Sequence, residues 1–267
     1  MGGCGKDNDY LITITTPFGE MKAVLYDETP EHKKNFIKLA LEGKYDSTIF
    51  HRIIKEFMVQ GGDINQKKGN TETIDYTIPA EFIPKYYHKK GALAAARQGD
   101  QANPKKASSG SQFYIVQGKT WTEAELTTDM NKLNSAVMNL MRYPGYDSVA
   151  QQIQAVYAAQ DYDMYNQILF SLIPDVKEKM GVDVSKTVPA ERLKTYTTLG
   201  GSPWLDDQYT VFGEVVEGIE IIDQIAAVVT DRGDRPVDNI HMTIKVEEMP
   251  KKKITKLYGV QYPETDK

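Results

Sequence analysis

Hydrophobic and β-branched residues alternate with polar residues in many short runs of this chain, and Gly, Asn and Pro clusters separate the runs. Alternation with a period of two is typical of a strand with one buried face. It predicts strands over residues 10–16, 20–26, 48–54, 57–60, 92–96, 112–116, 210–215 and 240–248. Pro17-Phe18-Gly19 predicts the turn of a hairpin between the first two. Many short strands with few helices favour an antiparallel sheet that is closed or sandwiched.

Two helices are expected among these strands. Thr29-Pro30-Glu31 supplies a hydroxyl cap, a proline for the first turn and an acid near the positive end of the helix dipole. Apolar residues follow at helical spacing, and Gly43 ends the helix. Residues 219–229 predict the second helix of the same domain.

Residues 119–199 have a different pattern. Thr120-Trp121-Thr122-Glu123 is interpreted as a capping box, and apolar residues then recur at intervals of four and three from 126 to 140. This pattern predicts an inserted helical subdomain. The expected organisation is a flexible leader at 1–9, a barrel domain at 10–118 and 200–249, a helical insert at 119–199 and a C-terminal tail at 250–267.

Composition and charge exclude several classes of protein. The chain is 40% hydrophobic and 26% charged, as in ordinary globular proteins, and its formal net charge of -5 gives no reason to expect nucleic acid as a partner. No apolar run approaches the roughly 20 residues of a membrane-spanning helix. The four histidines are scattered without metal-ligand spacing, so neither a metal nor a cofactor is expected.

The single cysteine, Cys4, excludes an intrachain disulfide. It follows Gly2-Gly3 and precedes polar, acidic residues, as at the mature start of a bacterial lipoprotein. On this interpretation the protein is lipid-anchored in the bacterial cell envelope, in the periplasm or at the outer membrane. The alternative is a free thiol in a disordered leader, with a cytoplasmic location left open.

The segment from Phe50 to Asp63 carries the most chemistry. It combines Arg52, the apolar pair Phe57-Met58, and Gln60 before a Gly-Gly-Asp turn. These side chains converge on one groove if the chain bends between them. A permanent cation beside an apolar pocket suggests a site for an amide rather than for a nucleophile or a metal.

Three segments together resemble the cyclophilin family of peptidyl-prolyl cis-trans isomerases. They are Phe50–Asp63, Gly91–Arg97 with Gly110–Ile115, and Trp204–Asp206 with Tyr209–Val215. The resemblance covers about residues 10–117 and 202–248. It implies a mainly β fold, namely an eight-stranded antiparallel β-barrel capped by two helices, to which the α-helical subdomain is added. The activity it implies is rotation of X-Pro peptide bonds in unfolded or flexible polypeptides, assisting protein folding.

The resemblance also implies roles for individual residues. The catalytic residues would be Arg52, Phe57, Gln112 and Leu205. The substrate-binding residues would be His51, Met58, Gln60, Ala96, Arg97, Phe113, Tyr114, Trp204 and Tyr209. Arg52 would donate a hydrogen bond to the prolyl nitrogen of the twisted amide. It suits this role because it is always charged and its guanidinium fork is rigid. His51 receives no proton-transfer role, because the reaction deprotonates nothing.

Four positions depart from the commonest family pattern. Lys55-Glu56 replaces a Pro-Gly turn and Arg97 replaces an asparagine. Tyr114 replaces a phenylalanine on the pocket floor, so its hydroxyl needs a partner or water, and Tyr209 replaces a rim histidine. The last two are expected to weaken binding of cyclosporin-type ligands more than activity.

Two other functions stay open from the sequence. One is a chaperone that binds proline-containing peptides, or a partner-docking module, with the insert as its recognition element. The other is a purely structural envelope protein. The ends of the insert join segments that both supply the groove, so both ends are expected near it.

Overall fold

The computed structural model describes residues 7–69 and 71–262, so Cys4 and its predicted lipid lie outside the described residues. The chain divides into two compact units, Met1–Thr120 with Leu199–Lys267 and Trp121–Thr198. Each unit is built around its own hydrophobic core.

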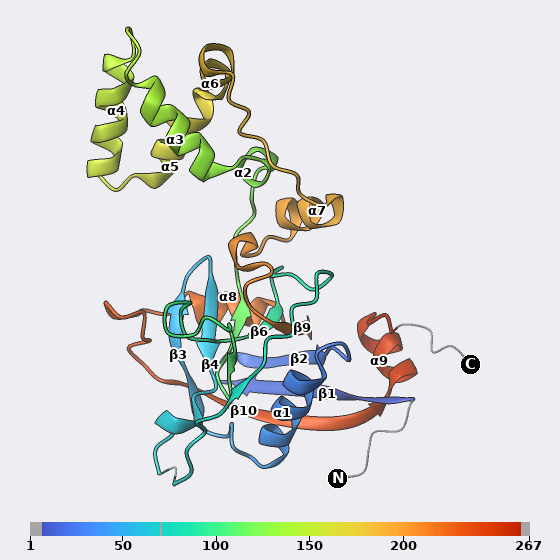
Figure 1. Ribbon diagram of the computed structural model, residues 1–267. Helices are drawn as coiled ribbons and strands as arrows, with labels where there is room; N and C mark the ends of the chain where they lie inside the picture. Colours follow the sequence, from blue (N-terminus) through green and yellow to red (C-terminus); the bar gives the residue numbers. More distant parts are fainter. Residues whose placement is uncertain (1–6, 70, 263–267) are drawn as a thin grey trace. The chain divides into compact units, whose positions relative to one another are not determined.

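Eight antiparallel strands of the first unit close into a barrel in the order β1-β10-β3-β4-β8-β6-β9-β2 (Figure 1). They are β1 (Asn8–Thr16), β2 (Gly19–Leu25), β3 (Thr48–Ile54), β4 (Met58–Gly61), β6 (Ala92–Ala95), β8 (Phe113–Val116), β9 (Val211–Glu217) and β10 (Ile240–Pro250). Thr16 pairs with Gly19, which confirms the predicted hairpin turn. The described residues include one more sheet, which pairs β5 (Thr77–Ile78) with β7 (Ser108–Ser109).

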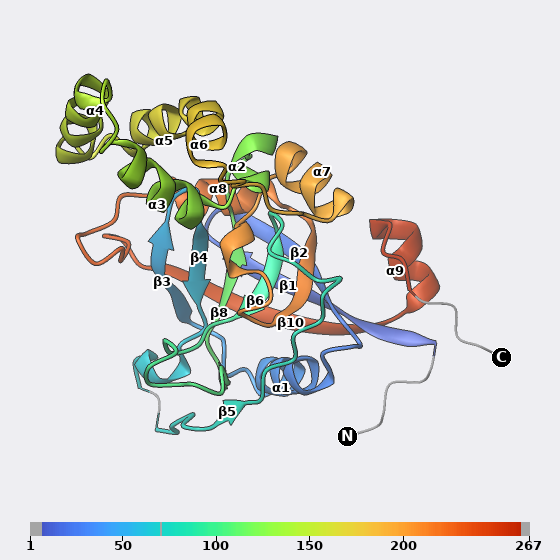
Figure 2. The same ribbon diagram turned by 45° about the horizontal axis from the view of Figure 1, so that its top comes forward.

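Two helices cover the openings of the barrel. Helix α1 (Pro30–Leu41) and helix α8 (Glu220–Ala226) lie at opposite ends of the strands in both ribbon views (Figures 1 and 2). Phe36 of α1 and Ile222 and Ile225 of α8 enter one core cluster with the inward-facing strand residues. Each such side chain contributes about 1.5–3 kcal/mol by leaving water. The predicted fold class, a barrel with two capping helices and a helical insert, is confirmed.

Strand alternation sorts side chains between the core and the outer face. In β8, Phe113 and Ile115 belong to the core inside the barrel, whereas Tyr114 and Val116 belong to a separate outer cluster. The outer cluster also contains Met58, Leu205, and Ala92 and Ala94 of β6. This outer cluster is the floor on which the candidate site is built.

The second unit is helical. It contains α2 (Glu123–Thr127), α3 (Met130–Leu140), α4 (Asp147–Ala158), α5 (Tyr162–Ser171), α6 (Ile173–Met180) and α7 (Ala190–Thr198). Leu133, Val137 and Leu140 of α3 pack with Leu169 and Val176, as their spacing predicts. The capping box is formed by Thr122 and Glu125, not by the Thr120–Glu123 pair expected from sequence.

The C-terminal residues also differ from expectation. The segment expected as a C-terminal tail contains helix α9 (Lys251–Tyr258). Ile254 of this helix is fully buried and packs with Leu11, Val24 and Met249. Lys252, Lys253 and Lys256 are exposed, whereas Lys251 pairs with Asp27 at 2.9 Å, so one buried residue and one ion pair hold the helix against the barrel. None of the helices within the described residues combines the length and apolar character needed to cross a membrane.

Candidate active site

A cavity of about 190 Å³ opens on the outer face of the barrel. It is lined by Arg52, Phe57, Met58, Gln60, Ala96, Arg97, Tyr114, Leu205 and Tyr209, all of which the sequence predicted as site residues. Met58, Tyr114 and Leu205 are buried and make its apolar floor. The Arg52 side chain is 45% exposed, so a hydrated cation stands beside an apolar slot.

A β-bulge in β3 turns Arg52 toward this cavity. Phe50 pairs with Gly61 and Arg52 with Gln60, so His51 is an extra residue in the ladder. In a regular strand, residues two apart share a face. The bulge instead lets Phe50 enter the barrel core while Arg52 faces outward. Such re-aiming of a side chain is a recurrent use of bulges beside active sites.

An amide chain fixes the orientation of Gln60. Its Nε2 donates to Gln112 Oε1 at 3.0 Å, and Gln112 Nε2 donates to Asp63 Oδ2, also at 3.0 Å. Asp63 can only accept, so it determines which way both amides point. Gln112 therefore positions Gln60 and does not line the apolar cavity. Gln112 lines the adjoining cavity instead, and its catalytic role stays a prediction.

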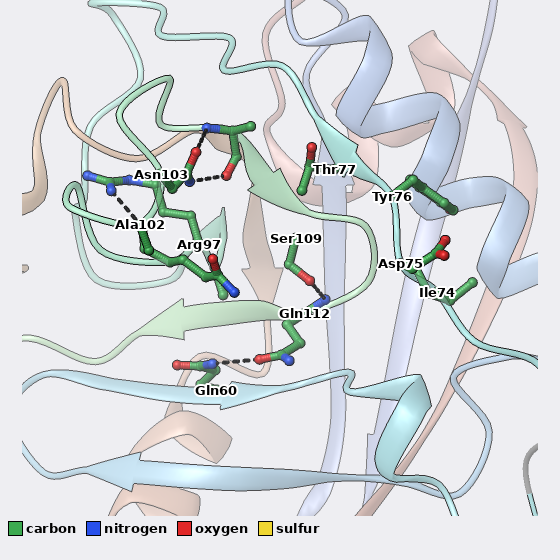
Figure 3. A pocket seen from close by; sticks show the side chains of 13 residues that line it. Gln60, Ile74, Asp75, Tyr76, Thr77, Arg97, Ala102, Asn103, Ser109 and Gln112 are labelled. Atoms are coloured by element: carbon green, nitrogen blue, oxygen red, sulfur yellow. Dashed lines mark hydrogen bonds between the residues drawn. The ribbon is translucent and has the colours of Figure 1, made fainter.

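A second cavity of about 570 Å³ adjoins the first, since Gln60, Ala96 and Arg97 line both. Figure 3 shows the hydrogen-bonded Gln60 and Gln112 along one side and Tyr76, Asp75 and Ile74 on the opposite segment. Nine of its thirteen lining residues have polar side chains. The two cavities together form a groove with an apolar end and a polar end.

Arg97 is built into the wall of this groove. Its side chain is only 4% exposed, and its Nε donates to the Gln208 carbonyl at 3.0 Å. Its Nη1 donates to Asp100 at 2.6 Å, and the guanidinium lies 4.3 Å from the centre of the Tyr209 ring. The charge is thus already paired. Arg97 holds Tyr209 in place rather than offering a free cation to a substrate backbone.

Tyr114 finds the hydroxyl partner that the sequence required. His88 Nε2 lies 2.9 Å from the Tyr114 hydroxyl, and His88 Nδ1 lies 3.1 Å from Asp206 Oδ1. Because the carboxylate only accepts, Nδ1–H donates to Asp206, and in the neutral ring Nε2 then accepts from the Tyr114 hydroxyl. Burial, followed by the nearby Tyr209, raises the pKa of Tyr114 well above its ordinary value, so its hydroxyl stays protonated.

His88 and Asp206 were not predicted as site residues. The signal in the sequence was the tyrosine itself, because a buried phenol in an apolar pocket needs an acceptor. His88 lies three residues before the segment Gly91–Arg97, and Asp206 is the last residue of the segment Trp204–Asp206. Asp206 accepts from the His88 backbone N–H as well, at 2.9 Å, so it holds the histidine at two points.

Besides Gln112, three more predicted site residues lie outside the apolar cavity. Phe113 faces the barrel interior and packs against Phe36 and Tyr45, which corrects its expected role in substrate binding. Trp204 is half exposed and packs on Phe57, with ring centres 5.3 Å apart, so it extends the rim. His51 contacts Gln60 through Nε2 at 3.5 Å, and burial lowers its pKa, which favours the neutral ring.

Both ends of the helical insert are anchored at the rim. The N–H groups of Gln117 and Gly118 both donate to the Phe57 carbonyl at 3.0 Å, and Gly201 N–H donates to the Lys119 carbonyl at 3.0 Å. A Cβ on Gly118 would lie 2.3 Å from the Gly201 Cα, so only glycines permit this approach. The two segments of the barrel unit that lead into and out of the insert therefore lie side by side next to Phe57. Within residues 7–69 and 71–262, no cluster of three metal-ligating side chains occurs.

Comparison with known proteins agrees with this geometry. The family model described as "Cyclophilin type peptidyl-prolyl cis-trans isomerase/CLD" matches residues 11–155 and 191–246. A Staphylococcus haemolyticus protein named "Putative peptidyl-prolyl cis-trans isomerase" is 28% identical over 91% of this chain and 94% of its own length. A Streptococcus pyogenes "Putative bifunctional phosphatase/peptidyl-prolyl cis-trans isomerase" is 30% identical over 86% of this chain, which spans 37% of that protein.

Among solved structures, a Cryptosporidium parvum cyclophilin-type isomerase has a TM-score of 0.53 at 21% identity, over 91% of this chain and 99% of that one. At this identity the likeness shows the fold alone. The match to the family model spans most of the barrel unit and all three motif segments. The chain belongs to the cyclophilin-type peptidyl-prolyl cis-trans isomerase family.

Proposed function

We propose that the protein accelerates rotation about X-Pro peptide bonds in unfolded or flexible polypeptides and so assists their folding, with Arg52 as the donor that stabilises the twisted amide. One observation supports this role most directly. The half-exposed Arg52 guanidinium stands at the edge of an apolar cavity of about 190 Å³, where a proline ring would lie. No bond is made or cut in this reaction, so a donor and a slot are sufficient.

The barrier to rotation is about 18–20 kcal/mol because the amide nitrogen shares its lone pair with the carbonyl. In the twisted state the prolyl nitrogen recovers that lone pair and becomes a better acceptor. A hydrogen bond from Arg52 would then be stronger in the transition state than in either planar state, which is the condition for catalysis. Removing one such donor typically lowers turnover about 100- to 1,000-fold.

The other residues would hold the substrate. Phe57, Met58 and Leu205 would enclose the proline ring, with Tyr114 beneath it. Gln60, oriented through Gln112 and Asp63, would hydrogen-bond the substrate backbone. A related Cryptosporidium parvum isomerase, 20% identical, was crystallised in the presence of the dipeptide Ala-Pro, so an Ala-Pro peptide is a suitable first substrate. Tyr114 and Tyr209 would weaken binding of cyclosporin-type ligands.

Exchange spectroscopy by NMR on an Ala-Pro-containing tetrapeptide tests the proposal. The wild-type protein should raise the cis–trans exchange rate well above the uncatalysed rate, and Arg52→Ala should remove most of that increase. A matched control is Arg232→Ala, which removes an exposed arginine of the barrel unit and should leave the rate unchanged. Equal rates for wild type and Arg52→Ala would refute the role of Arg52.

A second candidate function is recognition of clients by the helical unit. Tyr157 and Tyr162 pack edge to face, with ring centres 6.3 Å apart, yet the two residues are 61% and 55% exposed. Large exposed aromatic side chains favour protein contacts. The double variant Tyr157→Ser/Tyr162→Ser should then protect an aggregating client less well while retaining tetrapeptide turnover. Unchanged protection would exclude these two residues from recognition.

We also propose, from the sequence around Cys4, that the protein is held in the bacterial cell envelope by a lipid on this cysteine. Mass spectrometry of the protein purified from its native cells should show a lipid-modified Cys4, and fractionation should place it with membranes. A Cys4→Ser variant should lose the lipid and move to the soluble fraction. An unmodified wild-type protein in the cytosol would refute the proposal.

A further inference from the structure

Arg52 makes an ion pair with an acidic residue far away in the sequence. Its Nε lies 3.6 Å from Asp234 Oδ2, and the two side chains are 45% and 43% exposed. Arg52 makes no other ion pair within the described residues. The distance is longer than a hydrogen bond, so the contact orients the guanidinium mainly through charge. Asp234 belongs to neither the apolar cavity nor the family segments.

The backbone around Asp234 is shaped to present this carboxylate. Asp231 accepts from the backbone N–H of Gly233 at 2.7 Å and of Arg235 at 3.1 Å, and its own N–H donates to the Arg235 carbonyl at 2.8 Å. Asp234 closes the turn with a φ of +63°, a conformation that non-glycine residues seldom adopt, although Asp and Asn tolerate it. The turn is thus fixed by its own hydrogen bonds.

A second contact ties this turn to the strand that carries Arg52. The Ile53 N–H donates to the Asp234 carbonyl at 2.8 Å. Asp234 therefore makes two contacts with β3. Its carbonyl accepts from the backbone of Ile53, and its carboxylate lies beside the Arg52 side chain. Two independent contacts to adjacent residues make the placement of the carboxylate specific rather than a chance meeting of surface charges.

We propose that Asp234 is a positioning residue that holds Arg52 in its productive orientation. Arginine loses about 2 kcal/mol of rotamer entropy when its side chain is fixed. With its Nε edge beside Asp234, Arg52 keeps its two terminal amino groups for the prolyl amide. Without Asp234 the guanidinium samples several rotamers, and turnover falls by the fraction of time it spends out of place. This role rests on the proposed function of Arg52.

The test compares Asp234→Asn and Asp234→Gly with Asp238→Asn. Asparagine keeps the shape and tolerates the positive φ, and glycine favours that φ, so both variants preserve the turn. Asp238→Asn removes the same charge from an exposed position nearby. Exchange rates at saturating and at low tetrapeptide separate kcat from KM. Both Asp234 variants should lower kcat about 3- to 10-fold with KM within twofold, and Asp238→Asn should match wild type.

Two further measurements separate positioning from structural support. In an Arg52→Ala background, Asp234→Asn should change turnover by less than about 1.5-fold, because nothing remains to be positioned. In 1 M KCl, where the screening length is about 3 Å, the difference between wild type and Asp234→Asn should shrink. Wild-type turnover in both Asp234 variants, or an equal loss in the Arg52→Ala background, would overturn the inference. An active Arg52→Ala protein would instead refute the proposed function itself.

Discussion

Replacing Tyr114 by phenylalanine removes one hydroxyl from the floor of the apolar cavity. The hydroxyl donates to His88 Nε2 at 2.9 Å, and His88 is fully buried. Its Nδ1–H remains held by Asp206, so the ring cannot turn to find another donor. The variant therefore leaves a buried acceptor without a partner. Leaving such a group unsatisfied costs about 1–3 kcal/mol.

The expected loss of stability is thus about 1–3 kcal/mol, or a melting temperature lowered by about 2–4 °C for each kcal/mol. The aromatic ring itself remains in the pocket, so tetrapeptide turnover should fall by less than about threefold. Stability and turnover are therefore expected to separate in this variant.

Urea unfolding followed by tryptophan fluorescence measures the stability change. The chain has two tryptophans, so a Trp121→Phe background leaves Trp204, which packs on Phe57 beside the cavity, as the single reporter. Tyr258→Phe is a matched control, because no hydrogen bond of its hydroxyl occurs among the described residues. A Tyr114→Phe protein as stable as wild type, or one that loses turnover without losing stability, would refute the reasoning.

Three other predictions concern stability and binding. Burial lowers the pKa of His32, which favours the neutral form of the ring that lies within hydrogen-bond distance of Glu81 and Ser108. The stabilisation that comes from this lowered pKa is complete above the unfolded pKa of about 6.5 and decreases as the pH falls below it. The urea unfolding midpoint should therefore change less between pH 8 and pH 5 in His32→Gln than in the wild type. A non-glycine residue in the left-handed conformation costs about 1–2 kcal/mol. Gly259→Ala, with a φ of +72° and open space around it, should cost only that amount, whereas Gly118→Ala should cost more because its Cβ would also meet Gly201. Leu205→Ala should raise KM about 5- to 30-fold, or about 1–2 kcal/mol, and an unchanged KM would exclude Leu205 from the proline slot.

The strands could be predicted because alternation is a local signal, and the barrel into which they close was implied by the family resemblance. Alternation places each strand residue on one of two faces, and three motif segments in order identify the family, which the match confirms. The same alternation could have excluded Phe113 from the groove, since it neighbours Tyr114 and must face the other way. The bulge at His51 has no such signal, because its extra residue is visible only in the pairing of β3 with β4.

Contacts between distant segments were beyond prediction from one sequence. More than half of the sequence separates Asp234 from Arg52, and the helical insert lies between His88 and Asp206 in the sequence. Neither pair has a characteristic spacing, because the closure of the barrel brings the residues together. The catalytic and binding roles of the site residues stay predictions until their variants are measured.

The central claim is that the Arg52 guanidinium acts on the twisted amide and not on the ground state. The most direct test measures the cis–trans exchange rate of an enzyme-saturated Ala-Pro tetrapeptide, together with its affinity, for wild type, Arg52→Lys and Arg52→Ala. We expect the bound-state rate to fall about 100-fold or more in Arg52→Ala and nearly as far in Arg52→Lys, with affinities within about threefold of wild type. Bound-state rates equal to wild type, with only the affinity reduced, would contradict the account.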